Sequence, residues 1–516
     1  MLSQVTSGTI RGVEAYLVRV EVDQSRGLPS MTVVGLPEGA VREGRERVTA
    51  AIQNSGFDLP PRRFTINLAP ADVPKNGSAF DLPIALGLLA GTGAVRGDWL
   101  AEACFVGELG LDGELRPVRG VLPLALRCRE QGVRTLVVPA ANAKEAAVVG
   151  EIDVIAPASL QQLIRHLAGR ERIASARVDP HALFAEPGGS ATGLDYADVR
   201  GQELAKRALE IAAAGQHNIL MVGPPGSGKS MLARRLPGIL PPLSLAEAVE
   251  VTRVHSVAGR LGAGQALVAH RPFRAPHHTA SEAALVGGGS WPRPGEVSLA
   301  HHGVLFLDEL PEFRRTALES LRQPLEDGVV HVGRARHSVT FPALVMLAAA
   351  MNPCPCGHYG DGAGRCVCHE GQVRRYTQRV SGPLLDRIDV HVEVPALPPR
   401  TLLARGAAES SASIRDRVIA ARERQHHRFR SSPGIYANAH MGPREVRDWC
   451  ALDQAGETLL RTAIQKLHLS ARAYHRVLKL ARTIADLRGT DAVSAANVAE
   501  AIQHRNLDRT RAHAAV

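Results

Sequence analysis

The chain has 516 residues, which is enough for about three domains that each bury a core. Its hydrophobic content of 45% and charged content of 22% are typical of globular proteins in water, and no apolar run approaches the roughly 20 residues of a membrane-spanning helix. A net charge of +10 favours a polyanionic partner, although genome base composition also explains a chain rich in arginine. Seven cysteines are too few for a disulfide framework, and we therefore expect a cytoplasmic protein.

Residues 1–170 alternate β-prone and helical patterns, which predicts an α/β domain. The expected strands are Ala15–Val22, Ser30–Val34, Arg63–Leu68 and Thr135–Pro139, and the expected helices are Val41–Ser55 and Phe80–Leu89. The first residues lack the basic-then-apolar layout of a signal peptide. Residues 171–193 are polar and contain glycine and proline, so we interpret them as a linker.

A glycine-rich loop follows a short apolar strand, Ile219–Val222, and precedes a helical pattern that begins at Met231. This order of strand, loop and helix is the setting in which G-x-x-x-x-G-K-S binds phosphate. The loop comprises Gly223, Pro224, Pro225, Gly226, Ser227, Gly228, Lys229 and Ser230. Its backbone N–H groups would surround the phosphates, Lys229 would contact the β- and γ-phosphates, and the Ser230 hydroxyl would bind Mg²⁺. The sequence therefore predicts a nucleoside triphosphate site in an ATPase core, residues 194–395.

A second apolar strand ends in two carboxylates, Asp308 and Glu309. A buried parallel strand places such acids at its carboxyl end, which is the edge where open α/β sheets bind ligands. We expect Asp308 to hold Mg²⁺ and Glu309 to orient and polarise the attacking water. Together with the phosphate loop, the pair predicts hydrolysis of ATP.

A third strand, Ala343–Ala350, is followed by Asn352. An amide beside the γ-phosphate would position the water, as sensor 1 does in AAA+ ATPases. An Asn before a proline also forms turns, which is the alternative interpretation. The place of Asn352 one strand after the two carboxylates favours the catalytic role.

Four cysteines occur in two close pairs shortly after Asn352: Cys354, Cys356, Cys366 and Cys368. Four thiolates in this arrangement can form a tetrahedral Zn²⁺ site that fixes a loop, in which His358 or His369 would be alternative ligands. A loop of reduced thiols without metal is the other interpretation.

Arginines complete the predicted machinery. Arg387, which follows Leu384-Leu385-Asp386, would stabilise transition-state charge at a neighbouring subunit's γ-phosphate, and a salt bridge at a helix end is the alternative. A break at Pro395–Arg400 leads into residues 396–516, where repeated helical patterns predict a lid domain. One helix of that region carries Arg472 and Arg476, one of which would contact the nucleotide; we favour Arg472.

Two further passages accompany these residues: Arg271-Pro-Phe-Arg-Ala-Pro-His-His-Thr-Ala-Ser, and Pro294-Gly-Glu-Val-Ser-Leu-Ala-His-His-Gly before the Asp308 strand. With them, essentially the whole chain resembles the magnesium-chelatase-like AAA+ family known as YifB or ComM. The resemblance implies an AAA+ P-loop core, an N-terminal α/β domain like that of Lon protease, and a C-terminal helical lid. It also implies a bacterial, hexameric DNA helicase that drives branch migration during natural transformation.

In the AAA+ group that this resemblance implies, a hairpin before sensor 1 lines the central pore. The segments Val329–Val332 and His337–Phe341 are β-prone and flank Gly333, Arg334 and Arg336. Two arginines at a hairpin tip can contact DNA phosphates without reading bases. A solvated surface hairpin is the alternative.

The Lon-like domain that the resemblance implies would lack the protease's Ser–Lys pair. The serine position falls on Ala79 and the lysine position on Leu122, so we expect no proteolysis. The function that the sequence predicts is an ATP- and Mg²⁺-dependent homohexameric motor acting on single-stranded or branched DNA. The alternative is a chelatase-type motor that remodels a metal-insertion partner.

Overall fold

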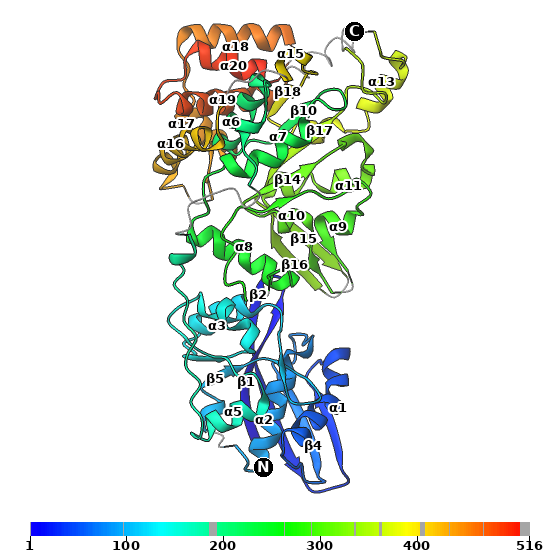
Figure 1. Ribbon diagram of the computed structural model, residues 1–516, viewed down its shortest axis with the longest axis vertical. Helices are drawn as coiled ribbons and strands as arrows, with labels where there is room; N and C mark the ends of the chain where they lie inside the picture. The colour runs from blue at the N-terminus through cyan, green and yellow to red at the C-terminus, as the bar shows by residue number, and fades with distance from the viewer. Residues whose placement is uncertain are drawn as a thin grey trace. The chain divides into compact units, whose positions relative to one another are not determined.

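The computed structural model describes residues 2–95, 98–184, 193–262, 264–289, 291–334, 337–360, 364–402, 408–432, 434–467 and 469–505. The chain forms two compact units (Figure 1). Unit 1 comprises Met1–Glu186, Ser244–Ala269 and Ala335–Thr340, and unit 2 comprises Pro187–Leu243, His270–Arg334 and Phe341–Val516. None of the helices in the described ranges is both long enough and apolar enough to cross a lipid bilayer.

Unit 1 is built on a seven-stranded mixed sheet with the order β3-β4-β2-β1-β5-β8-β9. Its strands are β1 (Leu2–Arg11), β2 (Glu14–Ser25), β3 (Ser30–Val34), β4 (Arg63–Ala69), β5 (Ala103–Phe105), β8 (Thr135–Val137) and β9 (Asp153–Ile155). A separate short ribbon pairs β6 (Glu108–Leu109) with β7 (Leu115–Arg116). The strands β1 and β2 form a long antiparallel hairpin at the centre of the sheet, so its central pairing is between segments that are adjacent in sequence.

Unit 1 also contains the helices α1 (Gly39–Asn54), α2 (Asp81–Gly91), α3 (Val121–Glu130), α4 (Ala143–Ala147), α5 (Leu160–Leu167) and α8 (Leu245–Ala258). The helix α2 is buried along its whole length and packs on β1 and β2, as its uniformly apolar sequence requires. The predicted strands and helices of this region agree with the observed ones to within a few residues. No sequence pattern predicted β1, and none indicated that α8 packs against α3.

The segment that we interpreted as a linker begins with an ordered stretch. The Ala176 N–H donates to Val154 O in β9 at 2.8 Å, and the Val154 N–H donates to Ser175 Oγ at 3.1 Å. Residues 185–192 lie outside the described ranges. The chain therefore continues to pack on unit 1 for several residues beyond α5.

Unit 2 contains a five-stranded sheet with the order β11-β14-β17-β10-β18, in which every neighbouring pair is parallel. Its strands are β10 (Ile219–Val222), β11 (Phe273–Arg274), β14 (Val304–Leu307), β17 (Met346–Met351) and β18 (Val390–Glu393). The residues of β10, β14 and β17 are all buried, which is the pattern of a parallel sheet covered on both faces. Short helices connect the strands: α6 (Glu203–Gly215), α7 (Lys229–Arg235), α9 (Glu282–Val286), α10 (Glu296–Leu299), α11 (Arg315–Ser320), α12 (Pro324–Asp327), α13 (Glu370–Thr377), α14 (Gly382–Leu385) and α15 (Pro399–Leu402).

Two small hairpins occur along the chain between β11 and β17. The first pairs β12 (Gly287–Gly288) with β13 (Arg293–Pro294), where Gly287 has a φ of +102° that favours glycine. The second pairs β15 (Val329–Arg334) with β16 (His337–Pro342), as the β-prone segments predicted. Arg336 lies outside the described residues, and of Arg334 only the backbone is described.

The C-terminal part of unit 2 is helical, as predicted, with α16 (Ser411–Phe429), α17 (Pro443–Trp449), α18 (Gln454–Leu467), α19 (Ala471–Leu487) and α20 (Ala495–Gln503). In Figure 1 these helices lie together beside α6. The contacts of α6 with α16 and α19 join them to the sheet, and one hydrophobic core runs through both parts. The structure is therefore an α/β fold with a P-loop sheet and a helical C-terminal domain packed on it.

Candidate functional site

The phosphate loop follows β10 at the carboxyl edge of the sheet. Gly226 and Gly228 have φ values of +74° and +95°, a region in which glycine is favoured. At Gly223 a Cβ atom would lie 2.1 Å from Val394 O, so this position has no room for a side chain. The helix α7 begins at Lys229, directly after the loop. Glycine is therefore required at both ends of the loop, for space at one end and for backbone conformation at the other.

Lys229 is the best-connected side chain of the loop. Its ammonium donates to Gly223 O at 2.7 Å, to Pro224 O at 2.9 Å and to Asn352 Oδ1 at 3.2 Å. Burial lowers the pKa of Lys229, and the nearby Asp308 carboxylate opposes this shift. The ammonium is held by two carbonyls and one amide at the mouth of the loop. All three are neutral acceptors that a phosphate oxygen can replace.

Ser230 and Asp308 meet across the strands. The Ser230 hydroxyl donates to Asp308 Oδ2 at 2.5 Å, and the Glu309 N–H donates to Asp308 Oδ1 at 3.0 Å. A hydroxyl and a carboxylate are the oxygen donors that suit Mg²⁺, which keeps several waters and binds one or two carboxylates beside a phosphate. The donor set therefore fits a magnesium ion at this position.

Asn352 lies between the two strands that carry these groups. It follows β17 directly, and β17 is hydrogen-bonded to β10 on one side and to β14 on the other. The buried Tyr376 lies close to the Asn352 backbone, and burial raises the pKa of Tyr376 to about 12. The sheet thus brings Lys229, Ser230, Asp308 and Asn352 together at one edge.

Glu309 has a contact that sequence reasoning missed. Its backbone has a φ of +52°, and its Oε2 lies 3.2 Å from His278 Nδ1. The His278 ring in turn stacks on His277, with ring centroids 4.1 Å apart. The only signal in the sequence was the passage from Arg271 that contains both histidines. His278 therefore lies where its ring can orient the Glu309 carboxylate.

Replacing His278 with alanine is expected to lower the kcat of ATP hydrolysis about fivefold with little change in KM, because a hydrogen bond that orients the carboxylate is worth about 1 kcal/mol. His278→Asn keeps a donor near the Nδ1 position and should recover much of the rate. The control is His277→Ala, because the His277 Nδ1 is 2.9 Å from Thr279 Oγ1 and contacts no carboxylate there. Steady-state kinetics that determine kcat and KM separately check the prediction. Equal losses in His278→Ala and His277→Ala would contradict it.

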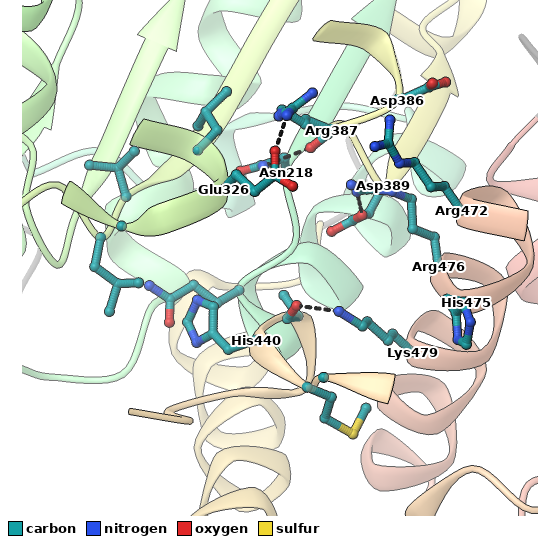
Figure 2. Close-up of a pocket in the computed structure, with 18 of the residues that line it drawn as sticks. Asn218, Glu326, Asp386, Arg387, Asp389, His440, Arg472, His475, Arg476 and Lys479 are labelled. Carbon is teal, nitrogen blue, oxygen red and sulfur yellow. Dashed lines mark hydrogen bonds and ion pairs between the residues drawn. The ribbon is translucent and has the colours of Figure 1, made fainter. Parts of the chain in front are cut away.

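The two predicted arginines lie in a different place. Arg387 and Arg472 line a cavity of about 410 Å³ that also contains Arg476 and Lys479, and no phosphate-loop residue lines it (Figure 2). Arg387 donates to Pro383 O at 2.9 Å and forms an ion pair with Glu326. The structure therefore does not bring Arg387 or Arg472 to Lys229 of the same chain.

Arg476 has a structural partner in this cavity. Figure 2 shows Arg472 and Arg476 projecting from α19, with Arg476 paired to the buried Asp389. His217 Nδ1 lies 3.1 Å from the same carboxylate. Burial alone would raise the pKa of Asp389, but Arg476 and His217 hold it well below its usual value. Arg476 is thus occupied in joining α19 to β18, whereas Arg472 is exposed on the same helix.

The four clustered cysteines come together beside the nucleotide edge. Their Sγ atoms all lie within 4.8 Å of one another. Cys354 is buried, and the other three are partly exposed. This is a second candidate ligand site in unit 2.

The two positions that the resemblance compares with the serine and lysine of Lon protease are Ala79 and Leu122. Leu122 is fully buried in α3, and the nearby Ser78 hydroxyl contacts the Glu108 carboxylate. Lys75, also buried, donates to Pro70 O.

Three family models match the chain in succession. Residues 20–142 match subunit ChlI of Mg-chelatase, residues 195–402 match magnesium chelatase subunit ChlI, and residues 408–505 match the C-terminal region of that subunit. The chain is 45% identical over 513 residues to competence protein ComM of Haemophilus influenzae, covering 98% of each chain. It is also 45% identical over 504 residues to the uncharacterized protein YifB of Salmonella typhimurium, covering 97% of this chain and 96% of that one. The 67 kDa subunit of magnesium chelatase from Chlorobaculum parvum is 29% identical over 168 residues, which are 31% of this chain.

Proposed function

Because this chain belongs to the magnesium-chelatase-like AAA+ family of ComM and YifB, we propose that it is an ATP-driven motor that moves DNA strands. The observation that carries the proposal is the meeting of Lys229, Ser230, Asp308 and Asn352 at one sheet edge. These groups supply the phosphate contact, the magnesium ligands and the polar amide of a hydrolytic nucleotide site.

Each residue has a defined part in hydrolysis. Lys229 leaves its carbonyl partners to bind the β- and γ-phosphates, and Ser230 and Asp308 hold Mg²⁺, which neutralises phosphate charge when bound. Glu309, positioned by His278, accepts a proton from the attacking water. Asn352 orients that water through its amide. The site thus combines orientation with charge stabilisation, which are the main sources of rate enhancement in phosphoryl transfer.

The separate place of Arg387 supports a shared active site. Since Arg387 and Arg472 line a cavity away from Lys229, they are available to the nucleotide of a neighbouring subunit. If each interface between subunits holds one ATP, the subunits must contact one another head to tail in a closed ring. We propose that this ring is a homohexamer. In the isolated chain, Glu326 neutralises Arg387, and assembly would exchange this carboxylate for phosphate.

Arg387→Ala is expected to assemble but to hydrolyse ATP about 10³-fold or more slowly, the usual effect of removing such an arginine. Mixing Arg387→Ala with Lys229→Ala should recover activity, because some interfaces then combine an intact Lys229 with an intact Arg387. ATPase activity measured across mixing ratios checks this expectation. The control is Arg379→Ala, which removes a surface ion pair with Glu312. Activity that never rises above the sum of the two variants would show that Arg387 acts within its own chain.

Two features support DNA as the substrate of the motor. The net charge is +10, and a relative with 45% identity is named a competence protein. We propose that hairpins β12/β13 and β15/β16 face the threaded strand, with Arg334 and Arg336 contacting phosphates. The expected outcome is strand separation or branch migration on recombination intermediates, as in natural transformation.

The second candidate is a chelatase-type motor that remodels a metal-insertion partner. The matches to magnesium chelatase favour it, although the chelatase relative matches only 31% of the chain whereas ComM matches 98%. ATPase assays with and without forked or single-stranded DNA separate the two functions. Stimulation by DNA supports the first, and a rate indifferent to DNA supports the second.

A further inference from the structure

The four clustered cysteines have the spacing of metal ligands. Cys354 Sγ lies 3.4 Å from Cys356 Sγ and 3.8 Å from Cys366 Sγ, and Cys356 Sγ lies 3.7 Å from Cys366 Sγ. Four sulfurs bound tetrahedrally at about 2.3 Å from a zinc ion lie roughly 3.8 Å apart. A disulfide would need about 2.05 Å. The sulfur positions therefore fit a shared cation and do not fit bonded pairs.

The setting of these thiols differs from that of the cysteines in the core. Cys104 and Cys128 are fully buried among apolar side chains, as unmodified cysteines usually are. In the cluster, Cys356, Cys366 and Cys368 are each partly exposed, so apolar packing does not explain why they gather. The two pairs also lie near opposite ends of the chain segment that connects β17 to α13. A ligand bound by all four sulfurs accounts for both features.

We propose that Cys354, Cys356, Cys366 and Cys368 bind one structural Zn²⁺ ion. Four protein thiolates complete a tetrahedral zinc site and leave no position for water, so the ion has no catalytic role. The site lies against the nucleotide edge described above, and this second part of the proposal rests on the proposed function.

The contacts on either side of the cluster show how the metal would act. Gly357 has a φ of +84°, its N–H donates to Cys354 O at 3.0 Å, and a Cβ atom on it would lie 2.4 Å from Pro225 Cδ. The segment between the first two ligands and α13 therefore rests directly on the phosphate loop. Beyond the last ligand, the buried Tyr376 of α13 lies close to the Asn352 backbone. Zinc thus fixes the loop that holds the four cysteines together with the helix α13 that follows it. We call this loop and helix the brace. The brace lies against both the phosphate loop and Asn352, the residue that contacts Lys229.

Metal analysis of the full-length protein tests the zinc assignment directly. Wild type purified without chelator is expected to carry about one zinc per chain, and cobalt-substituted protein should show the thiolate charge-transfer and visible bands of a tetrahedral site. The double variant Cys356→Ala/Cys366→Ala should lose the metal, whereas Cys104→Ala/Cys128→Ala should keep it. Wild type that takes up neither zinc nor cobalt, with all four thiols free to react, would overturn the assignment. Because this result needs only wild type, it stands even if the double variant folds poorly.

Nucleotide affinity tests the brace. Wild type stripped of metal is expected to bind an ATP analogue about tenfold more weakly, and added zinc should restore the affinity. Lys229→Ala should retain its full zinc content, since it contacts none of the ligands. An affinity that is indifferent to zinc would overturn the brace. A chain that carries zinc but never binds ATP would instead refute the proposed function and leave the metal site standing.

Discussion

Lys229→Ala is expected to weaken ATP binding by about tenfold to a hundredfold and to abolish turnover. The ammonium is placed at the mouth of the loop by three neutral acceptors, and a hydrogen bond to a charged group is worth about 1.5–3 kcal/mol. Equilibrium binding of a fluorescent ATP analogue measures the effect. The control is Lys144→Ala, which removes an exposed lysine from α4 in unit 1. Equal affinities in the two variants would contradict the assignment of the phosphate site.

Glu309→Gln is expected to preserve ATP binding and to slow hydrolysis by about 10²–10⁴-fold. Glutamine keeps the size and the hydrogen-bonding reach of the side chain but cannot accept the proton of water, and a general base contributes a factor of this order. Single-turnover hydrolysis and equilibrium binding, measured on the same preparation, check both halves. Glu312→Gln is the matched control, because Glu312 pairs on the surface with Arg379 at 2.8 Å. Normal turnover in Glu309→Gln would refute the role.

The nucleotide edge was the part of the site that the sequence could predict. The residue directly after a buried strand of a parallel sheet lies at the carboxyl edge of that sheet, and this rule applied to Gly223, Asp308 and Asn352. The order of the strands was not predicted. The structure places β17 between β10 and β14, which is why Asn352 reaches Lys229.

Other parts of the fold had no comparable local signal. The strand β1 contains Ser7, Gly8 and Thr9 on its buried stretch, so its sequence lacks the alternation of a typical strand. A Cβ atom on Gly8 would lie 2.2 Å from Leu124 Cδ1 in α3, so a larger residue there would have to displace the Leu124 side chain. That constraint comes from a residue far along the chain, which single-sequence reasoning does not detect.

Contacts over long separations also decided which residues belong together. Arg253 of α8 donates to Val13 O at 3.0 Å, and Ser256 of α8 hydrogen-bonds with the buried Glu145. These contacts assign Ser244–Ala269 to unit 1, although the segment follows the phosphate loop in sequence. The contact of His278 with Glu309 and that of Gly357 with Pro225 arise in the same way. Sequence patterns identified the chemistry, and three-dimensional packing identified the residues that position it.

We propose that ATP cleaved at the Lys229 edge is used to drive a DNA strand through the assembled protein. A three-strand branch-migration reaction, followed with wild type and Glu309→Gln in parallel, tests this claim most directly. We expect wild type with ATP and Mg²⁺ to convert branched intermediates to products, and Glu309→Gln to bind the same DNA without converting it. Vigorous ATP hydrolysis by wild type with no strand movement on any branched substrate would contradict the claim.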